Sequence, residues 1–318
     1  MSAVGAAAPE VLVGSRARPG RSRGESTSDA WRTLRTAARL GWATESNWTD
    51  PVLFGIYSVA KPIASVLMLV VMLEVISGGS APPQYRAFVV VGSSLWSFVV
   101  GGMAGLAWSV LDDRERYRML KYLYISPNSL LVVLLGRGAA RVAIAAMGAV
   151  ITLLVGVVFL GVHLDLGVVN WPMLLYSMVL GLLSIVALGI ILAAVCMQTR
   201  QESWSYPEAV AGALFLVVGA VFPLAVLPTP VQFAGFLTPL AWWMEGVRRS
   251  LFPGAVSGIG GPGSLWQQLT GTAAPDSVEI AACMLVSTVL VTAVSLAAYR
   301  WSEHRAKERG LFDQTTGS

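Results

Sequence analysis

Long apolar runs, separated by short polar segments, are the feature that most constrains this chain. They cover about residues 61–77, 87–111, 139–161, 171–197, 207–227 and 278–299. As helices that rise ~1.5 Å per residue, such runs can cross a hydrocarbon core of ~30 Å. Only 13% of the residues are charged, against roughly 25% in soluble domains. We therefore predict an all-α, polytopic membrane protein with six transmembrane helices rather than a soluble domain.

The segments that flank these runs divide the chain into four predicted parts. These are a disordered basic arm at 1–28, an interfacial amphipathic helix and elbow at 29–59, the six-span transmembrane domain at 60–300 and a cytoplasmic tail at 301–318. In the second part, apolar residues recur at helical spacing and form one stripe, which consists of Trp31, Leu34, Ala38 and Trp42. A row of arginines lies beside this stripe. This pattern favours a helix lying in the membrane interface, with packing on another domain as the alternative.

Proline and glycine predict where the spans begin, end and pack. We expect Pro62 at the start of the first span, and we expect Pro223 to end or kink the fifth. Residues 227–252 remain largely apolar but contain three further prolines, which predicts a broken helical hairpin on the outer face before the last span. Gly101-x-x-x-Gly105 in the second span permits close helix packing, either within the chain or between two copies.

Lysine and arginine are distributed very unequally between the two sides of the predicted spans. With the amino terminus inside, only Arg86, Arg248 and Arg249 of the 22 Lys and Arg residues fall outside. Basic residues collect on the cytoplasmic side of membrane proteins. We therefore predict a multi-pass protein of the plasma (inner) membrane, with both termini and the segment 112–127 in the cytoplasm.

Several kinds of chemistry lack the residues they need. A formal net charge of +4 is too small to indicate nucleic-acid binding, and the two histidines, His163 and His304, are too far apart to predict a metal site. The sequence has no phosphate-binding Gly-x-x-x-x-Gly-Lys-Ser/Thr loop and no hydrolase or metalloprotease motif. We therefore expect neither an enzyme nor a cofactor in this chain. Glu74 and Glu208 lie near the ends of spans, which argues against an ion-coupled transporter.

The densest cluster of charge is the segment 112–127, between the second and third spans. Apolar residues, Leu120 among them, recur there at helical spacing beside several tyrosines, and Arg and Tyr are enriched at protein interfaces. The segment is either a docking surface or a solvated face that sets orientation. Arg137 and Arg141, one helical turn apart, either tie it to the third span by pairing with its carboxylates or snorkel to the membrane surface.

This arrangement resembles the permeases of the type-2 exporter family of ABC transporters over about residues 29–300, and two motifs carry the resemblance. The first runs Asp113-Arg114-Glu115, Leu120, Ser126-Pro127 and Gly136-Arg137, with Tyr117-Arg118 where the family usually has Gly-Thr. The second is Leu227-Pro228, ten further residues, Pro239-Leu240-Ala241-Trp242, and then Arg248 after five more.

The resemblance implies a subunit that pairs with a second permease copy in the lipid bilayer and with two cytoplasmic ATP-binding subunits, which carry ATP and Mg. The implied ATPase-coupling loop comprises Asp113, Arg114, Glu115, Tyr117, Leu120, Tyr122 and Pro127. The implied outer gate comprises Pro239, Trp242, Glu245 and Arg248, and the alternative for its tryptophans is a membrane-interface belt. Candidate substrate contacts are Phe98, Met103, Trp108 and Phe215.

The leading functional hypothesis is the permease subunit of an ATP-driven exporter for an amphiphilic drug-like or lipid-like compound, working by alternating access. A lipid-linked polysaccharide exporter is the alternative within the same class. A non-transporting membrane anchor or assembly protein is the alternative from a different class.

Overall fold

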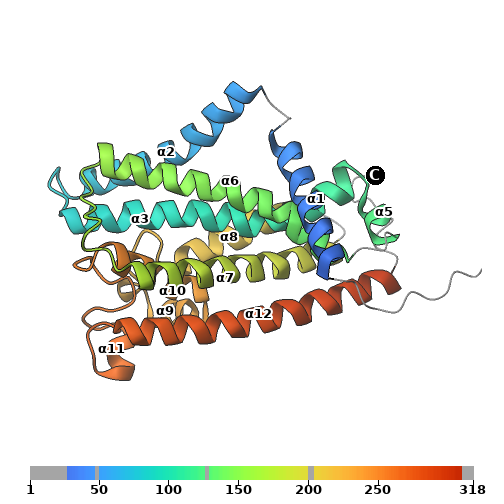
Figure 1. Ribbon diagram of the computed structural model, residues 1–318. Coiled ribbons are helices and arrows are strands. Elements are labelled where there is room, and N and C mark those ends of the chain that lie inside the picture. The colour runs from blue at the N-terminus through green and yellow to red at the C-terminus, as the bar shows by residue number, and fades with distance from the viewer. Residues whose placement is uncertain (1–26, 47–49, 126–128, 200–203, 310–318) are drawn as a thin grey trace, which may run out of the picture.

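The computed structural model describes residues 27–46, 50–125, 129–199 and 204–309, and all regular elements in these ranges are helices. The predicted basic arm therefore lies almost wholly outside the described residues. Figure 1 shows a bundle in which α3 (Pro83–Val99), α6 (Leu130–Phe159), α7 (Trp171–Gln198) and α12 (Ser277–Glu308) run side by side. The all-α prediction holds for this described part of the chain.

Four helices in the described residues are long and apolar enough to cross a membrane. They are Pro83–Arg116, Leu130–Phe159, Trp171–Gln198 and Ser277–Glu308. They correspond to the second, third, fourth and sixth predicted spans. Two shorter apolar helices, Ile63–Ile76 and Ser205–Val217, occupy the positions of the first and fifth. The count of six spans is therefore not confirmed.

The fifth predicted span ends about ten residues early. Helix α8 covers Ser205–Val217, and Gly219 then adopts a φ of +73°, a left-handed conformation that favours glycine. A short 3-10 turn, η3 (Leu224–Val226), follows Pro223. The helix thus stops before the proline that we expected to end or kink it.

The helix that contains the first predicted span begins earlier than expected. Helix α2 covers Pro51–Ile76 as one element, and the Asp50 side chain caps it by accepting a hydrogen bond from the backbone N–H of Val52. Pro51 stands in the first helical turn, where a missing N–H costs little. Pro62, which we expected at the start of the first span, therefore lies inside α2.

The second predicted span is longer than expected and contains two π-helical segments. Helices α3 (Pro83–Val99) and α4 (Gly105–Leu111) are joined by the π-segment η1 (Val100–Ala104). A second π-segment, η2 (Asp112–Arg116), continues the helix into residues predicted to be loop. A Cβ atom at Gly101 would lie 2.4 Å from Ala145 Cβ on α6, so the Gly-x-x-x-Gly face packs within the chain.

Helix α1 (Thr27–Ser46) packs on α6 through small residues rather than through its tryptophans. Ala37 and Gly41 are buried, and a Cβ atom at Gly136 of α6 would lie 2.6 Å from Ala37 Cβ. The side chains of Trp31 and Trp42 remain exposed. The predicted helix is present, and its placement in a membrane interface stays a prediction.

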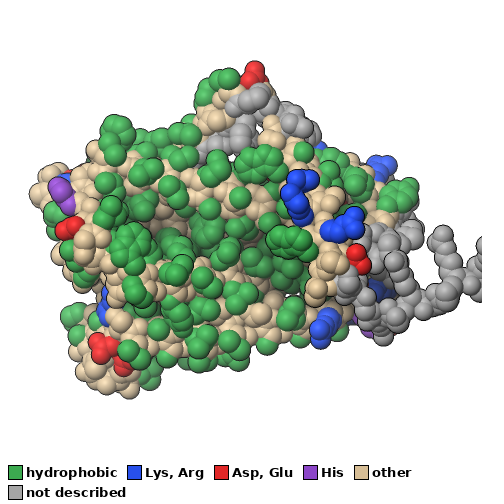
Figure 2. Space-filling view, in the orientation of Figure 1, with side chains coloured by type: hydrophobic (Ala, Val, Ile, Leu, Met, Phe, Trp, Pro, Cys, Tyr) green, Lys and Arg blue, Asp and Glu red, His purple; other side chains and the backbone are tan. Residues whose placement is uncertain are grey.

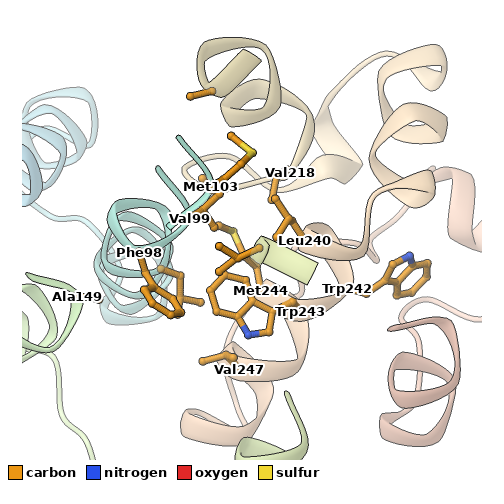
Figure 3. Packing of buried hydrophobic residues seen from close by; sticks show 14 of the residues in the cluster. Phe98, Val99, Met103, Ala149, Val218, Leu240, Trp242, Trp243, Met244 and Val247 are labelled. Atoms are coloured by element: carbon orange, nitrogen blue, oxygen red, sulfur yellow. The ribbon is translucent and has the colours of Figure 1, made fainter. Parts of the chain in front are cut away.

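The predicted broken hairpin corresponds to two short helices, α9 (Thr229–Leu237) and α10 (Pro239–Leu251), followed by α11 (Leu265–Thr270). Helix α10 packs against α7 and α12. Its Trp243 and Met244 are fully buried and form the centre of the hydrophobic core shown in Figure 3. The hairpin is therefore an integral part of the bundle.

Candidate functional site

The first three residues of the charged segment, at the end of the Pro83–Arg116 helix, are buried rather than solvated. Asp112, Asp113 and Arg114 are 7%, 5% and 4% exposed. Arg137 on α6 forms an ion pair with Asp113, and Arg141 Nη2 lies 2.6 Å from Asp112 Oδ2. Buried charges need such partners, because an unpaired one costs several kcal/mol. The two predicted arginines therefore do tie the segment to α6.

A further carboxylate and two backbone carbonyls, which the sequence did not single out, complete this cluster. Glu45 Oε1 in the last turn of α1 lies 2.7 Å from Arg141 Nη2. Arg114 donates hydrogen bonds to the carbonyls of Cys196 (2.9 Å) and Thr199 (3.0 Å) at the end of α7. The two backbone carbonyls could not have been predicted from the sequence. Glu45 could have been, because it is the only acidic residue in the last turn of α1. The cluster joins α1, α6 and α7 to the charged segment.

A short helix, α5 (Leu120–Ile125), projects beyond this cluster at the end of the bundle that also carries α1 (Figure 1). Arg118, two residues before α5, has a φ of +51°. The ring of the preceding residue, Tyr117, lies under the guanidinium of Arg137, with Cζ 5.6 Å from the ring centre. Leu120 is buried, whereas the Tyr122 side chain is 65% exposed. Pro127 lies outside the described residues. Helix α5 thus has a buried residue, Leu120, at its start and an exposed aromatic side chain, Tyr122, two residues further on.

A sequence profile of ABC-2 type transporters matches residues 42–252, which extend from the last turns of α1 through α10. The match covers more than half of the chain. The chain belongs to the ABC-2 type transporter family. No curated protein sequence matches it. The chain is accordingly a multi-pass membrane permease and not an ATPase, and permeases of this family generally work with ATP-binding subunits.

The surface of this ABC-2 family member separates charge from apolar side chains. Figure 2 shows hydrophobic side chains over the middle of the visible face, and most of its Lys and Arg side chains near the end that carries α1 and α5. The middle of the face carries few charged side chains. This distribution matches a bundle whose centre lies in hydrocarbon and whose α5 end reaches water.

At the opposite end of the bundle, the residues of the predicted outer gate are nearly fully buried. Glu245 accepts hydrogen bonds from Ser257 Oγ and the backbone N–H of Gly258, both at 2.6 Å. Its cationic partner is Arg249, with Nη2 3.7 Å from Oε1. Glu245 therefore holds the loop that follows α10 against the helix.

Arg248, next to Arg249 in the sequence, makes different contacts. It donates a hydrogen bond to the carbonyl of Ala220 (2.7 Å), and its guanidinium lies 3.6 Å from the centre of the Phe88 ring. Burial lowers the pKa of Arg248 to about 10, which leaves it charged at neutral pH. This arginine joins α10 to the turn after α8 and to α3.

Pro239 and Trp242 belong to the hydrophobic core of the hairpin. Pro239 begins α10, and the Trp242 indole donates a hydrogen bond to the carbonyl of Phe236 (2.9 Å). Trp242 and Trp243 are 4% and 0% exposed, so the alternative of a lipid-facing belt is wrong for both.

A cavity of about 520 Å³ lies between α2, the α3–α4 helix, α6 and α8. Trp108 lines it, and Phe215 lines an adjoining cavity of about 390 Å³ that shares Trp96 and Ser97 with the first. The Trp96 and Phe215 rings are 5.1 Å apart between centres. These volumes are typical of sites for drug-sized ligands.

The other two candidate substrate contacts lie elsewhere. Phe98 and Met103 are buried in the same hydrophobic core as Trp243 (Figure 3), and neither lines the cavities that include Trp108 and Phe215. Trp96 and Ser97, which the sequence did not single out, take their place in the cavity walls.

Proposed function

We propose that this ABC-2 permease is the membrane subunit of an ATP-driven exporter for an amphiphilic drug-like or lipid-like compound. Two copies of the chain would assemble with two ATP-binding subunits, which carry ATP and Mg. Alternating access would move the compound out of the cell through the plasma (inner) membrane. Family membership supports the transporter class, and the cavity volume supports a small amphiphile rather than a long glycan chain.

The proposed orientation places the α5 end and both termini in the cytoplasm. Only Arg86, Arg248 and Arg249 of the 22 Lys and Arg residues lie towards the other side. The positive-inside tendency supports this direction. The ATP-binding subunits would then meet the bundle at α5.

The observation that carries the proposal is the construction of the α5 end. Buried ion pairs from Asp112 and Asp113 to α6 fix the base of the segment. Tyr122 on α5 presents an exposed aromatic surface of the kind that dominates protein interfaces. A surface on such a base can transmit a push from a partner into the bundle without first having to become ordered.

Co-purification with the ATP-binding subunit encoded nearest to this chain tests the proposal. We expect Tyr122→Ala to weaken the complex and to lower ATP hydrolysis stimulated by the permease. Tyr85→Ala is the matched control, because Tyr85 is also exposed (38%) but lies at the start of α3, at the opposite end of the bundle. Equal recovery of the ATPase with both variants, or no recovery with the unaltered chain, would contradict the proposed docking.

A further inference from the structure

The charged side chains that line the 520 Å³ cavity are Glu45, Arg141 and Glu208. Arg141 already faces two carboxylates, because its Nη2 lies 2.7 Å from Glu45 Oε1 and 2.6 Å from Asp112 Oδ2. Its positive charge is therefore balanced within the protein. In the cavity lining itself, two carboxylates accompany one guanidinium.

Glu208 stands apart from that cluster. It lies in the first turn of α8, and it forms no ion pair with a Lys, Arg or His in the described part of the chain. Its ordinary role would be that of a solvated acidic residue at a helix start. Its position in the wall of the 520 Å³ cavity allows a second role, as the counter-charge of a ligand.

The apolar wall of the same cavity is aromatic. Trp96 and Trp108 line it, and Trp108 packs edge-on against Trp204 with the ring centres 5.9 Å apart. Tryptophan is the aromatic side chain that attracts organic cations most strongly through its ring face. A carboxylate and indole rings around one cavity form a site that is selective for positive charge on an apolar body.

We propose that this cavity binds amphiphilic organic cations, with Glu208 as the counter-charge and Trp96 and Trp108 as the aromatic walls. The inference rests on the proposed export function, because it names the substrate class of that permease. Lipophilic anions would be disfavoured by the excess of carboxylates, and neutral amphiphiles would lose the attraction to Glu208.

Tetraphenylphosphonium and tetraphenylborate test the charge preference, because they share one shape and carry opposite charges. Binding of each to the purified permease is measured by equilibrium dialysis against matched detergent. We expect saturable binding of tetraphenylphosphonium and at least about tenfold weaker binding of tetraphenylborate. Glu208→Gln should raise the Kd for the cation about fivefold, which is near the upper end of the contribution of a partly solvated ion pair. It should not raise the Kd for the anion.

Two further variants control for folding and for general charge. Glu208→Asp should retain most of the affinity for tetraphenylphosphonium. Glu308→Gln, at the exposed end of α12, should leave it unchanged. Equal Kd values for the two probes, no saturable binding of the cation, or an unchanged Kd in Glu208→Gln would each overturn the proposal.

The binding assay needs no ATPase, so its result separates the two proposals. A complex that assembles and hydrolyses ATP, but whose permease binds both probes equally, contradicts only the cation preference. A permease that selects the cation but recruits no ATPase contradicts the exporter and leaves the site intact.

Discussion

Breaking the ion pair between Asp113 and Arg137 tests whether burial makes the charged segment rigid. Each residue is 5% exposed, so removal of one partner leaves the other charge buried without its ion-pair partner. We expect Asp113→Leu and Arg137→Met each to lower the free energy of unfolding by about 3–5 kcal/mol. The double variant replaces both charges by apolar side chains, and its free energy of unfolding should lie within about 2 kcal/mol of that of the unaltered chain. The expected coupling energy between the two positions is therefore several kcal/mol.

Unfolding titrations in mixed micelles measure these differences, and the 11 tryptophans provide the fluorescence signal. Glu303 and Lys307 form the matched control, because their side chains are 26% and 39% exposed and lie 2.9 Å apart. Their coupling should stay below about 1 kcal/mol. If the losses at positions 113 and 137 simply add in the double variant, the two charges do not stabilise each other and the reasoning is refuted.

Two other predictions concern packing and the loop after α10. Gly136→Ala should lower the free energy of unfolding by about 1–3 kcal/mol, because the new methyl group would lie 2.6 Å from Ala37 Cβ. Gly212→Ala, in open space on α8, is the control and should not lower it. Equal stabilities of the two variants in the same titration would contradict the close α1–α6 contact. Glu245→Gln weakens the hydrogen bond from the Gly258 backbone N–H and should speed amide exchange at Gly258 about tenfold. Hydrogen-exchange mass spectrometry that finds no change there would show that the carboxylate does not hold this loop.

The ion pairs of the charged segment could be predicted from the sequence, because charge in an apolar chain has few permitted partners. Arg137 and Arg141 are one helical turn apart, so both face the same side of α6. The carboxylates Asp112 and Asp113 end the preceding helix, within reach of that side. Composition also predicted the helical class and four of the long helices.

Helix ends could not be predicted, because hydropathy does not record where backbone hydrogen bonding stops. The apolar run continues to residue 227, but α8 ends at Val217. Gly219 allows a left-handed turn there, and a Cβ atom at this position would lie 2.4 Å from Leu224 Cδ1. Arg118 shows the same limit, because its φ of +51° belongs to a turn in which the sequence offers no glycine.

The π-segment η1 changes which side chains of the second span share a face. A π-turn inserts about one extra residue, and one residue corresponds to roughly 100° around an α-helix. Positions before and after Val100–Ala104 therefore do not share the faces that a uniform 3.6-residue period gives. Trp96 and Trp108 reach one cavity, whereas Phe98 and Met103 enter the core.

Arg141 belongs both to the charged cluster and to the cavity wall, which bears on how the proposed exporter would couple the two. It holds Asp112 and Glu45, and it packs against Gly105 of α4, where a Cβ atom would lie 3.0 Å from its own. If the charged segment moves relative to α6, either its buried carboxylate loses its ion pair with Arg141 or Arg141 moves with it. Because an unpaired buried charge costs several kcal/mol, movement of α6 together with the segment costs less free energy. We infer that a push applied at α5 would reshape the cavity wall rather than unravel the loop.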